Sequence, residues 1–278
     1  MNQASIRRRF DRAGATYEHA AQVQKRVAAR LAALCPSEIH GNVLEIGAGS
    51  GLLTREIAPR CQGGVYVALD LAPGMLAHAA MPGARKVAAD GERPPFHPAT
   101  FDFLCSASAM HWYADPAASI AANLRLLRPG GGFAIALYVE GTLWELAAAS
   151  QATGFGSVYP MRPAAFYREL FANLPGVAAT VSEETHIVAH ESVGAMLRSL
   201  QGAGVTHTPG KKVASPARYR NFVRYYEERF RAGNGMIETT YAVALLSSDG
   251  SKRSEMPRQA RQEPQSPQAA LCLPKGNK

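Results

Sequence analysis

The stretch Val43-Leu44-Glu45-Ile46-Gly47-Ala48-Gly49-Ser50-Gly51 decides the fold of this 278-residue chain. Val43 to Ile46 have the length and the apolar character of a buried parallel strand. Leu52, Leu53 and Ile57 then recur at helical spacing, so the three glycines lie on a strand-to-helix turn. At such a turn the backbone bends sharply and approaches a ligand closely, and the N–H groups of the helix attract a negative group.

Two acidic residues follow the next two strands that the sequence predicts. Val65 to Leu69 form a second strand that ends at Asp70, and Arg85 to Ala89 form a third that ends at Asp90. Parallel strands end at one edge of a sheet, where a carboxylate can accept two hydrogen bonds from a ribose diol. Each acid could instead cap the helix that follows it. The glycine spacing is G-x-G-x-G rather than the dinucleotide G-x-G-x-x-G, so its meaning depends on these acids.

The chain resembles the class I S-adenosylmethionine-dependent methyltransferases in five ordered blocks: Leu44–Gly51, Ala68–Leu76, Ala89–Glu92, Phe101–Ser106 and Leu126–Gly132. The resemblance implies a Rossmann-like α/β fold, with a mostly parallel doubly wound sheet and a helical lid inserted after the fifth strand. It implies S-adenosyl-L-methionine as cofactor, with Glu45 at the methionine end, Asp70 at the ribose and Asp90 at the adenine amino group. The cofactor-binding residues expected from the resemblance are Glu45, Gly47, Gly49, Gly51, Asp70, Leu71, Met75, Asp90, Gly91 and Ser106.

A narrower resemblance, to the malonyl-acyl-carrier-protein O-methyltransferases of biotin synthesis, runs from about residue 6 to about residue 246. Its further blocks are Phe10–Ala20, Ala109–Trp112, Gly141–Leu146 and Met196–His207. It implies an enzyme that esterifies the free carboxylate of a malonyl thioester, carried by acyl carrier protein or by coenzyme A. It also places the N-terminal segment over the cofactor, where the Tyr17 hydroxyl would touch the methionine carboxylate or the substrate.

A malonyl carboxylate is already ionised at neutral pH, so its methylation needs positioning rather than a general base. Arg125 is the candidate cation for this carboxylate because its forked donors fit one, although it could merely complement a helix dipole. Tyr17 is the second candidate catalytic residue, although it could simply pack. His111 and Trp112 either line the acceptor pocket or belong to the core. The eight histidines are too scattered to predict a metal site.

We expect one methyltransferase domain over residues 1–246, with lid helices at about 141–173 and 192–231. A helix is expected over about 20–34, before Pro36. Residues 247–278 form a basic tail rich in Pro, Gln and Ser and without aromatic residues, which we expect to be disordered.

The net charge is +8, and residues 251–278 carry half of this excess, with six basic residues against Glu255 and Glu263. A second basic cluster lies inside the expected domain and contains Arg198, Lys211, Lys212, Arg218, Arg220, Arg224, Arg229 and Arg231, opposed by Glu227 and Glu228. It could be a solvated helix face, a dock for an acidic protein such as a carrier protein, or a nucleic-acid contact. We expect no nucleic-acid partner, and the first two interpretations stay open.

No window approaches the roughly 18 uninterrupted apolar residues of a membrane span, and no apolar run follows the basic N-terminus as in a secretory signal. The sequence therefore predicts a cytoplasmic protein with no membrane partner. Two alternatives to malonyl methylation stay open. One is a methyltransferase for a phenol, quinone or other metabolite, and the other is a methyltransferase-like module that binds without turnover.

Overall fold

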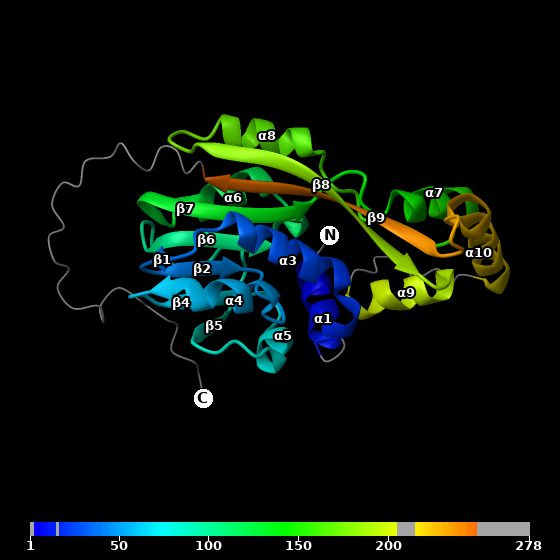
Figure 1. Cartoon of the computed structure of the whole chain (residues 1–278), viewed down its shortest axis with the longest axis horizontal. Coiled ribbons are helices and arrows are strands. Elements are labelled where there is room, and N and C mark those ends of the chain that lie inside the picture. The colour runs from blue at the N-terminus through cyan, green and yellow to red at the C-terminus, as the bar shows by residue number, and fades with distance from the viewer. Residues whose placement is uncertain (1–2, 15–16, 205–214, 249–278) are drawn as a thin grey trace, which may run out of the picture.

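The computed structural model describes residues 3–14, 17–204 and 215–248 (Figure 1). From residue 249 on, the expected disordered tail lies outside the described residues, as do Lys211 and Lys212. The expected boundary at residue 246 is too early, because the last strand, β9 (Ile237–Ser248), includes Ser247 and Ser248. No helix in the described ranges is long and apolar enough to cross a membrane.

A seven-stranded sheet forms the centre of the molecule, in the order β5-β4-β2-β6-β7-β9-β8. Its strands are β2 (Val43–Ile46), β4 (Tyr66–Asp70), β5 (Ala84–Ala88), β6 (Phe101–Ala107), β7 (Leu127–Tyr138), β8 (Ala179–His190) and β9. The first five are parallel to one another, and β9 runs antiparallel to both of its neighbours. The prediction of a mostly parallel, doubly wound sheet is confirmed.

The strand order places the ligand crevice. From β2 the chain moves outward through β4 to β5, and then crosses back to β6 on the other side of β2. Open α/β sheets bind ligands where the order reverses in this way, beyond the carboxyl ends of the strands. The glycine turn after Ile46 lies at this point.

Helices cover both faces of the sheet because neighbouring residues of a strand point to opposite sides. Val43 belongs to the core cluster under α3 (Gln22–Leu34) and α4 (Leu52–Ile57), which lie on the near face in Figure 1. Leu44 belongs to the cluster under α6 (Pro116–Leu124) and α8 (Ala164–Ala172). The helix expected over 20–34 begins at Gln22, because the backbone of Ala21 is not helical (φ −85°, ψ 45°).

The helices inserted after β7 divide into two groups. In Figure 1, α7 (Trp144–Thr153), α9 (Val193–Gly202) and α10 (Pro216–Phe230) gather near the far ends of β8 and β9. The helix α8 instead covers the sheet, where the Phe171 ring lies 5.4 Å from the Phe133 ring, centroid to centroid. The expectation that residues 141–173 form a lid is therefore wrong for the second half of this range. That half contains α8, which packs against the sheet.

Candidate functional site

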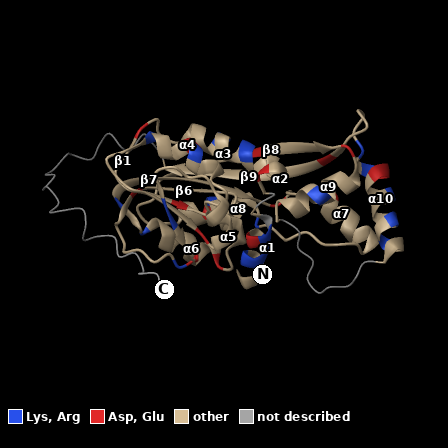
Figure 2. Cartoon of the chain, turned by 90° about the horizontal axis from the view of Figure 1, so that it is seen from below, with Lys and Arg blue, Asp and Glu red and all other residues tan. Residues whose placement is uncertain are grey.

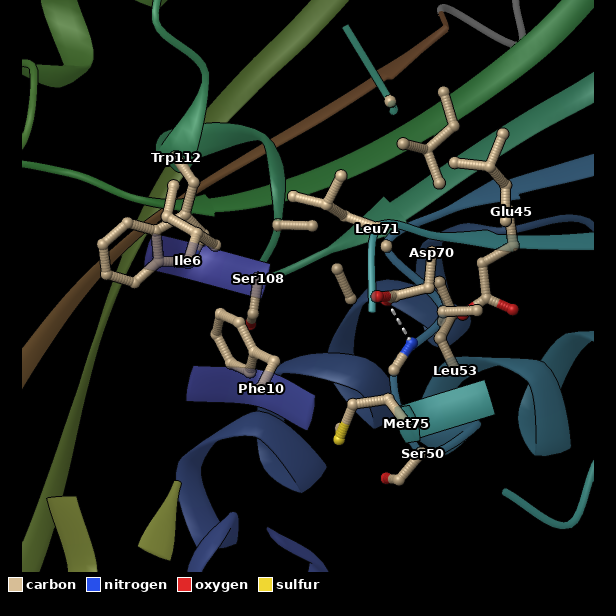
Figure 3. Close-up of a pocket in the computed structure, with 18 of the residues that line it drawn as sticks. Ile6, Phe10, Glu45, Ser50, Leu53, Asp70, Leu71, Met75, Ser108 and Trp112 are labelled. Atoms are coloured by element: carbon tan, nitrogen blue, oxygen red, sulfur yellow. Dashed lines mark hydrogen bonds between the residues drawn. The ribbon is translucent and has the colours of Figure 1, made fainter. Parts of the chain in front are cut away.

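A pocket lies at the carboxyl ends of β2, β4 and β6 (Figure 3). Its outer wall comes from the N-terminal helices α1 (Gln3–Ala13) and α2 (Tyr17–Ala20), through Ile6, Phe10 and Tyr17. Four carboxylates line it, those of Glu45, Asp70, Asp90 and Glu92, whereas no Lys, Arg or His is among the described lining residues. The pocket therefore suits a ligand that carries positive charge and hydrogen-bond donors.

Asp70 ties the glycine turn to the start of α5 (Pro73–His78). Its Oδ2 accepts a hydrogen bond from the Gly49 N–H at 2.8 Å, and its Oδ1 accepts one from the Ala72 N–H at 2.8 Å. Burial raises the pKa of Asp70, and the two backbone donors act in the opposite direction. Each oxygen keeps lone-pair capacity for a further donor, such as a hydroxyl.

The glycines of the turn have different structural roles. Gly47 has φ +75°, and a Cβ there would collide with the Cβ of Ala109 across the pocket floor. Gly51 has φ +87° and precedes α4 as its N-cap, and a Cβ there would lie 2.9 Å from Cγ of Met81. Gly51 shapes the turn but is not among the residues that line the pocket, so its contact with the cofactor stays a prediction.

Glu45 is a buried acid beneath the pocket floor, with 1% of its surface exposed. Its Oε2 accepts hydrogen bonds from Thr54 Oγ1 at 2.5 Å and from the Tyr66 hydroxyl at 2.7 Å. Burial nevertheless dominates and raises the pKa of Glu45 to about 7. The site thus contains an acid whose charge changes near neutral pH.

Gln3 closes one side of the pocket mouth. Its Nε2 donates to Asp90 Oδ2 at 3.0 Å and to Glu92 Oε1 at 2.9 Å. Glu92 is itself held by the N–H groups of Ala114 and Asp115, at the start of α6. The helix α1 is therefore fastened to the end of β5 by a side chain distant in the sequence.

Eight of the ten expected cofactor residues line this pocket: Glu45, Gly47, Gly49, Asp70, Leu71, Met75, Asp90 and Gly91. Ser106 does not, because β6 continues to Ala107 and Ser106 is fully buried inside the strand. Ser108, two residues farther along the chain, lies in the pocket wall and is labelled in Figure 3. Ser106 was expected at the pocket because the apolar residues of this strand end just before it. The strand β6 continues past Ser106 to Ala107, so the expectation was wrong.

Tyr17 lies in the pocket as expected. Burial and the nearby Asp70 raise the pKa of its hydroxyl, so Tyr17 stays protonated and can donate a hydrogen bond. Trp112 also lines the pocket, with its ring 6.3 Å from that of Phe10. His111 is buried beside Tyr138 instead, and burial lowers its pKa to about 3, so it is a neutral core residue.

Arg125 is not at the site. The helix α6 begins near the pocket, where Asp115 caps it, and carries the chain back to the opposite edge of the sheet before β7. Arg125 is exposed at the far end of this helix, and its carbonyl accepts a hydrogen bond from the Ala99 N–H. The prediction that Arg125 binds the carboxylate of the acceptor is wrong. A parallel crossover must return the chain to the amino ends of the strands, which is the edge opposite the pocket.

The variant Arg125→Gln should retain, within about twofold, the methyl transfer that the resemblance implies, as expected for a surface change away from a site. Steady-state kcat/KM of the purified variant beside the wild type would check this. A tenfold loss without a change in melting temperature would contradict the placement.

Several pocket residues were missed by the sequence analysis: Gln3, Ile6, Gln24, Ala28, Ser50, Leu53 and Ser108. Ile6 and Phe10 lie one helical turn apart, a spacing that predicts one apolar helix face. Gln3 gives no such signal, because its partners are 87 and 89 residues away.

Comparisons with known proteins identify the family and the fold. Residues 44–135 match a family model described as a methyltransferase domain. The chain is 35% identical over 236 residues to the biotin biosynthesis bifunctional protein BioCD of Bordetella avium, covering 81% of this chain and 49% of that protein, so it spans about half of that relative's length. It is 35% identical to the malonyl-[acyl-carrier protein] O-methyltransferase of Dechloromonas aromatica, covering 73% of this chain and 77% of that protein. The enzyme of the same name from Geobacter sulfurreducens is 30% identical, with coverages of 87% and 97%.

Solved structures share the fold. The YcgJ protein of Bacillus subtilis superposes with a TM-score of 0.55 at 15% identity, covering 83% of this chain and 97% of that one. Phosphoethanolamine N-methyltransferase 2 of Haemonchus contortus, in complex with S-adenosyl-L-methionine, superposes with a TM-score of 0.52 at 17% identity, with coverages of 86% and 57%. At these identities the likeness concerns the fold alone.

Proposed function

The chain belongs to the family of malonyl-[acyl-carrier protein] O-methyltransferases, and from this membership we propose that it methylates the free carboxylate of a malonyl thioester. The methyl donor in this proposal is S-adenosyl-L-methionine. The observation that carries it is the pocket at the switch point of the sheet, with its glycine turn and four carboxylates. The cytoplasmic location expected from the sequence is part of the same proposal.

The residues present fit this cofactor. Asp70, which keeps acceptor capacity beside the glycine turn, would hold the ribose hydroxyls. The acidic lining would favour the positively charged methionine end, and Asp90 with Gly91 would hold the adenine. When bound, the cofactor supplies a methyl group on a positively charged sulfur.

The chain's own residues would mainly exclude water and fix geometry. Phe10 and Trp112 cover the pocket with aromatic rings, which keeps water from a reacting carboxylate. The protonated Tyr17 hydroxyl would donate a hydrogen bond to the acceptor or to the cofactor carboxylate. No base is needed, because a carboxylate acceptor is ionised at neutral pH.

The lining charge also predicts an order of binding. The pocket's carboxylates repel an anionic acceptor until a positively charged cofactor is in place. Product inhibition and dead-end inhibition patterns should therefore show the cofactor binding first.

The direct test is to incubate the protein with labelled S-adenosyl-L-methionine and malonyl-acyl carrier protein, and to follow mass and label on the thioester. We expect a methyl-sized gain that an esterase removes. Malonyl-coenzyme A and a phenol are assayed in parallel, so that the acceptor class is decided in one experiment. Cofactor binding with no transfer to either malonyl thioester would overturn the proposed activity and favour another acceptor or a binding role.

A further inference from the structure

A second cavity, the basic groove, lies on the other side of the N-terminal helices. It is an open cavity of about 810 Å³ between α1, α2, the end of β8 and α9. Its polar lining includes Arg9, Arg12, His19, His190, Arg198 and Gln201. Nothing in the sequence analysis joined these residues, because they come from both ends of the chain.

The groove is positively charged. Three arginines line it, whereas no Asp or Glu is among its described lining residues. Arg12 and Arg198 are exposed, and neither forms an ion pair within the described ranges. His190 adds no charge at neutral pH, because burial lowers its pKa and its Nε2 lies 3.1 Å from Thr239 Oγ1. The positive charge is therefore that of guanidinium groups.

The basic groove and the acidic pocket share a wall. On α1, Ile6 and Phe10 line the pocket, while Arg9 and Arg12 line the groove. On α2, Tyr17 lines the pocket, while His19 lines the groove. Figure 2 shows that basic residues also lie on α9 and α10, beyond α1 toward one end of the molecule. Two cavities of opposite charge thus lie one helix apart.

We propose that the basic groove binds the phosphate of a phosphopantetheine arm, so that the acyl end of the arm reaches the pocket at Tyr17. The choice of this ligand rests on the proposed function, since both malonyl thioesters considered above carry such a phosphate. The four carboxylates of the pocket would repel a phosphate, whereas guanidinium forks match its oxygens in pairs. The open groove, about 810 Å³ in volume, suits a long arm better than a lone carboxylate.

The test measures binding, without turnover. Isothermal titration compares 4′-phosphopantetheine with pantetheine, which lacks the phosphate, on the wild type and on Arg12→Gln, Arg198→Gln and the double variant. We expect the phosphate to improve affinity, and each substitution to weaken phosphopantetheine binding about tenfold while leaving pantetheine binding unchanged. Arg85→Gln is the matched control, because Arg85 is an exposed arginine on the edge strand β5, outside the groove.

Equal affinity for the two compounds, or an equal loss in the Arg85→Gln control, would overturn the proposal. Coenzyme A and holo-acyl carrier protein, titrated in the same way, identify the source of the arm. A phosphate preference without any methyl transfer would refute the proposed activity alone. Methyl transfer without a phosphate preference would refute the groove alone. Circular dichroism and melting temperature confirm that each variant is folded.

Discussion

Replacing Asp70 with alanine is expected to weaken S-adenosyl-L-methionine binding by about 3 kcal/mol, roughly a hundredfold in Kd. The substitution removes a charged acceptor from the pocket and also frees the N–H groups of Gly49 and Ala72, which Asp70 holds in place. Both the proposed contact with the ribose and the support of the glycine turn are lost. Isothermal titration with the cofactor measures the effect.

The variant Asp70→Asn separates the two losses. An asparagine keeps the size of the side chain, but its single carbonyl oxygen can accept from only one of the two N–H groups. It should bind with intermediate affinity. Glu56→Ala, an exposed acid on α4, is the matched control and should bind like the wild type. Unchanged cofactor affinity in Asp70→Ala would remove Asp70 from the cofactor site.

The free energy of unfolding should fall as the pH rises from about 4.5 to about 7, because of Glu45. Its pKa is about 7 in the folded protein, above the ordinary value of 4.5 that it has in the unfolded chain, so the folded state binds the proton more tightly. Below pH 4.5 both states are protonated and there is no penalty. The loss in free energy of unfolding that comes from ionising Glu45 grows between pH 4.5 and pH 7. Above this range the loss stays constant, at about 3 kcal/mol.

The variant Glu45→Gln should abolish this part of the pH dependence, since glutamine does not titrate. Urea unfolding at pH 5 and pH 8 measures the difference for the wild type and the variant. Asp70, whose pKa is also raised, is present in both proteins, and its charge is one of the causes that raise the pKa of Glu45. The exposed Glu56→Gln serves as control. A slope that is the same in wild type and Glu45→Gln would show that Glu45 is ionised throughout.

The sequence predicts the fold well where the signals are local. The strand before Gly47 and the acids at Asp70 and Asp90 depend on residues adjacent in the chain, and a parallel sheet brings strand ends together without further information. The antiparallel β9 and the division of the inserted helices depend on packing between distant segments. Periodicity indicates that α8 is a helix, but not which surface Phe171 covers.

In the site, too, the sequence fails to predict what depends on contacts between distant segments, and single residues show this. Arg125 has suitable chemistry but lies at the wrong edge, because side-chain type says nothing of helix direction. The end of β6 at Ala107 decides that Ser108, and not Ser106, lines the pocket. Gln3 reaches Asp90 through a tertiary contact that no pattern near either residue indicates.

The shared wall formed by α1 makes the two cavities thermodynamically dependent on each other. A displacement of α1 that breaks the Gln3 bonds to Asp90 and Glu92 also moves Arg9 and Arg12. If occupation of the pocket fixes α1, it lowers the entropic cost of filling the groove, and linkage requires the reverse effect to be equally large. An N-terminal helix of eleven residues would thus give this enzyme a positive cooperativity between its two ligands.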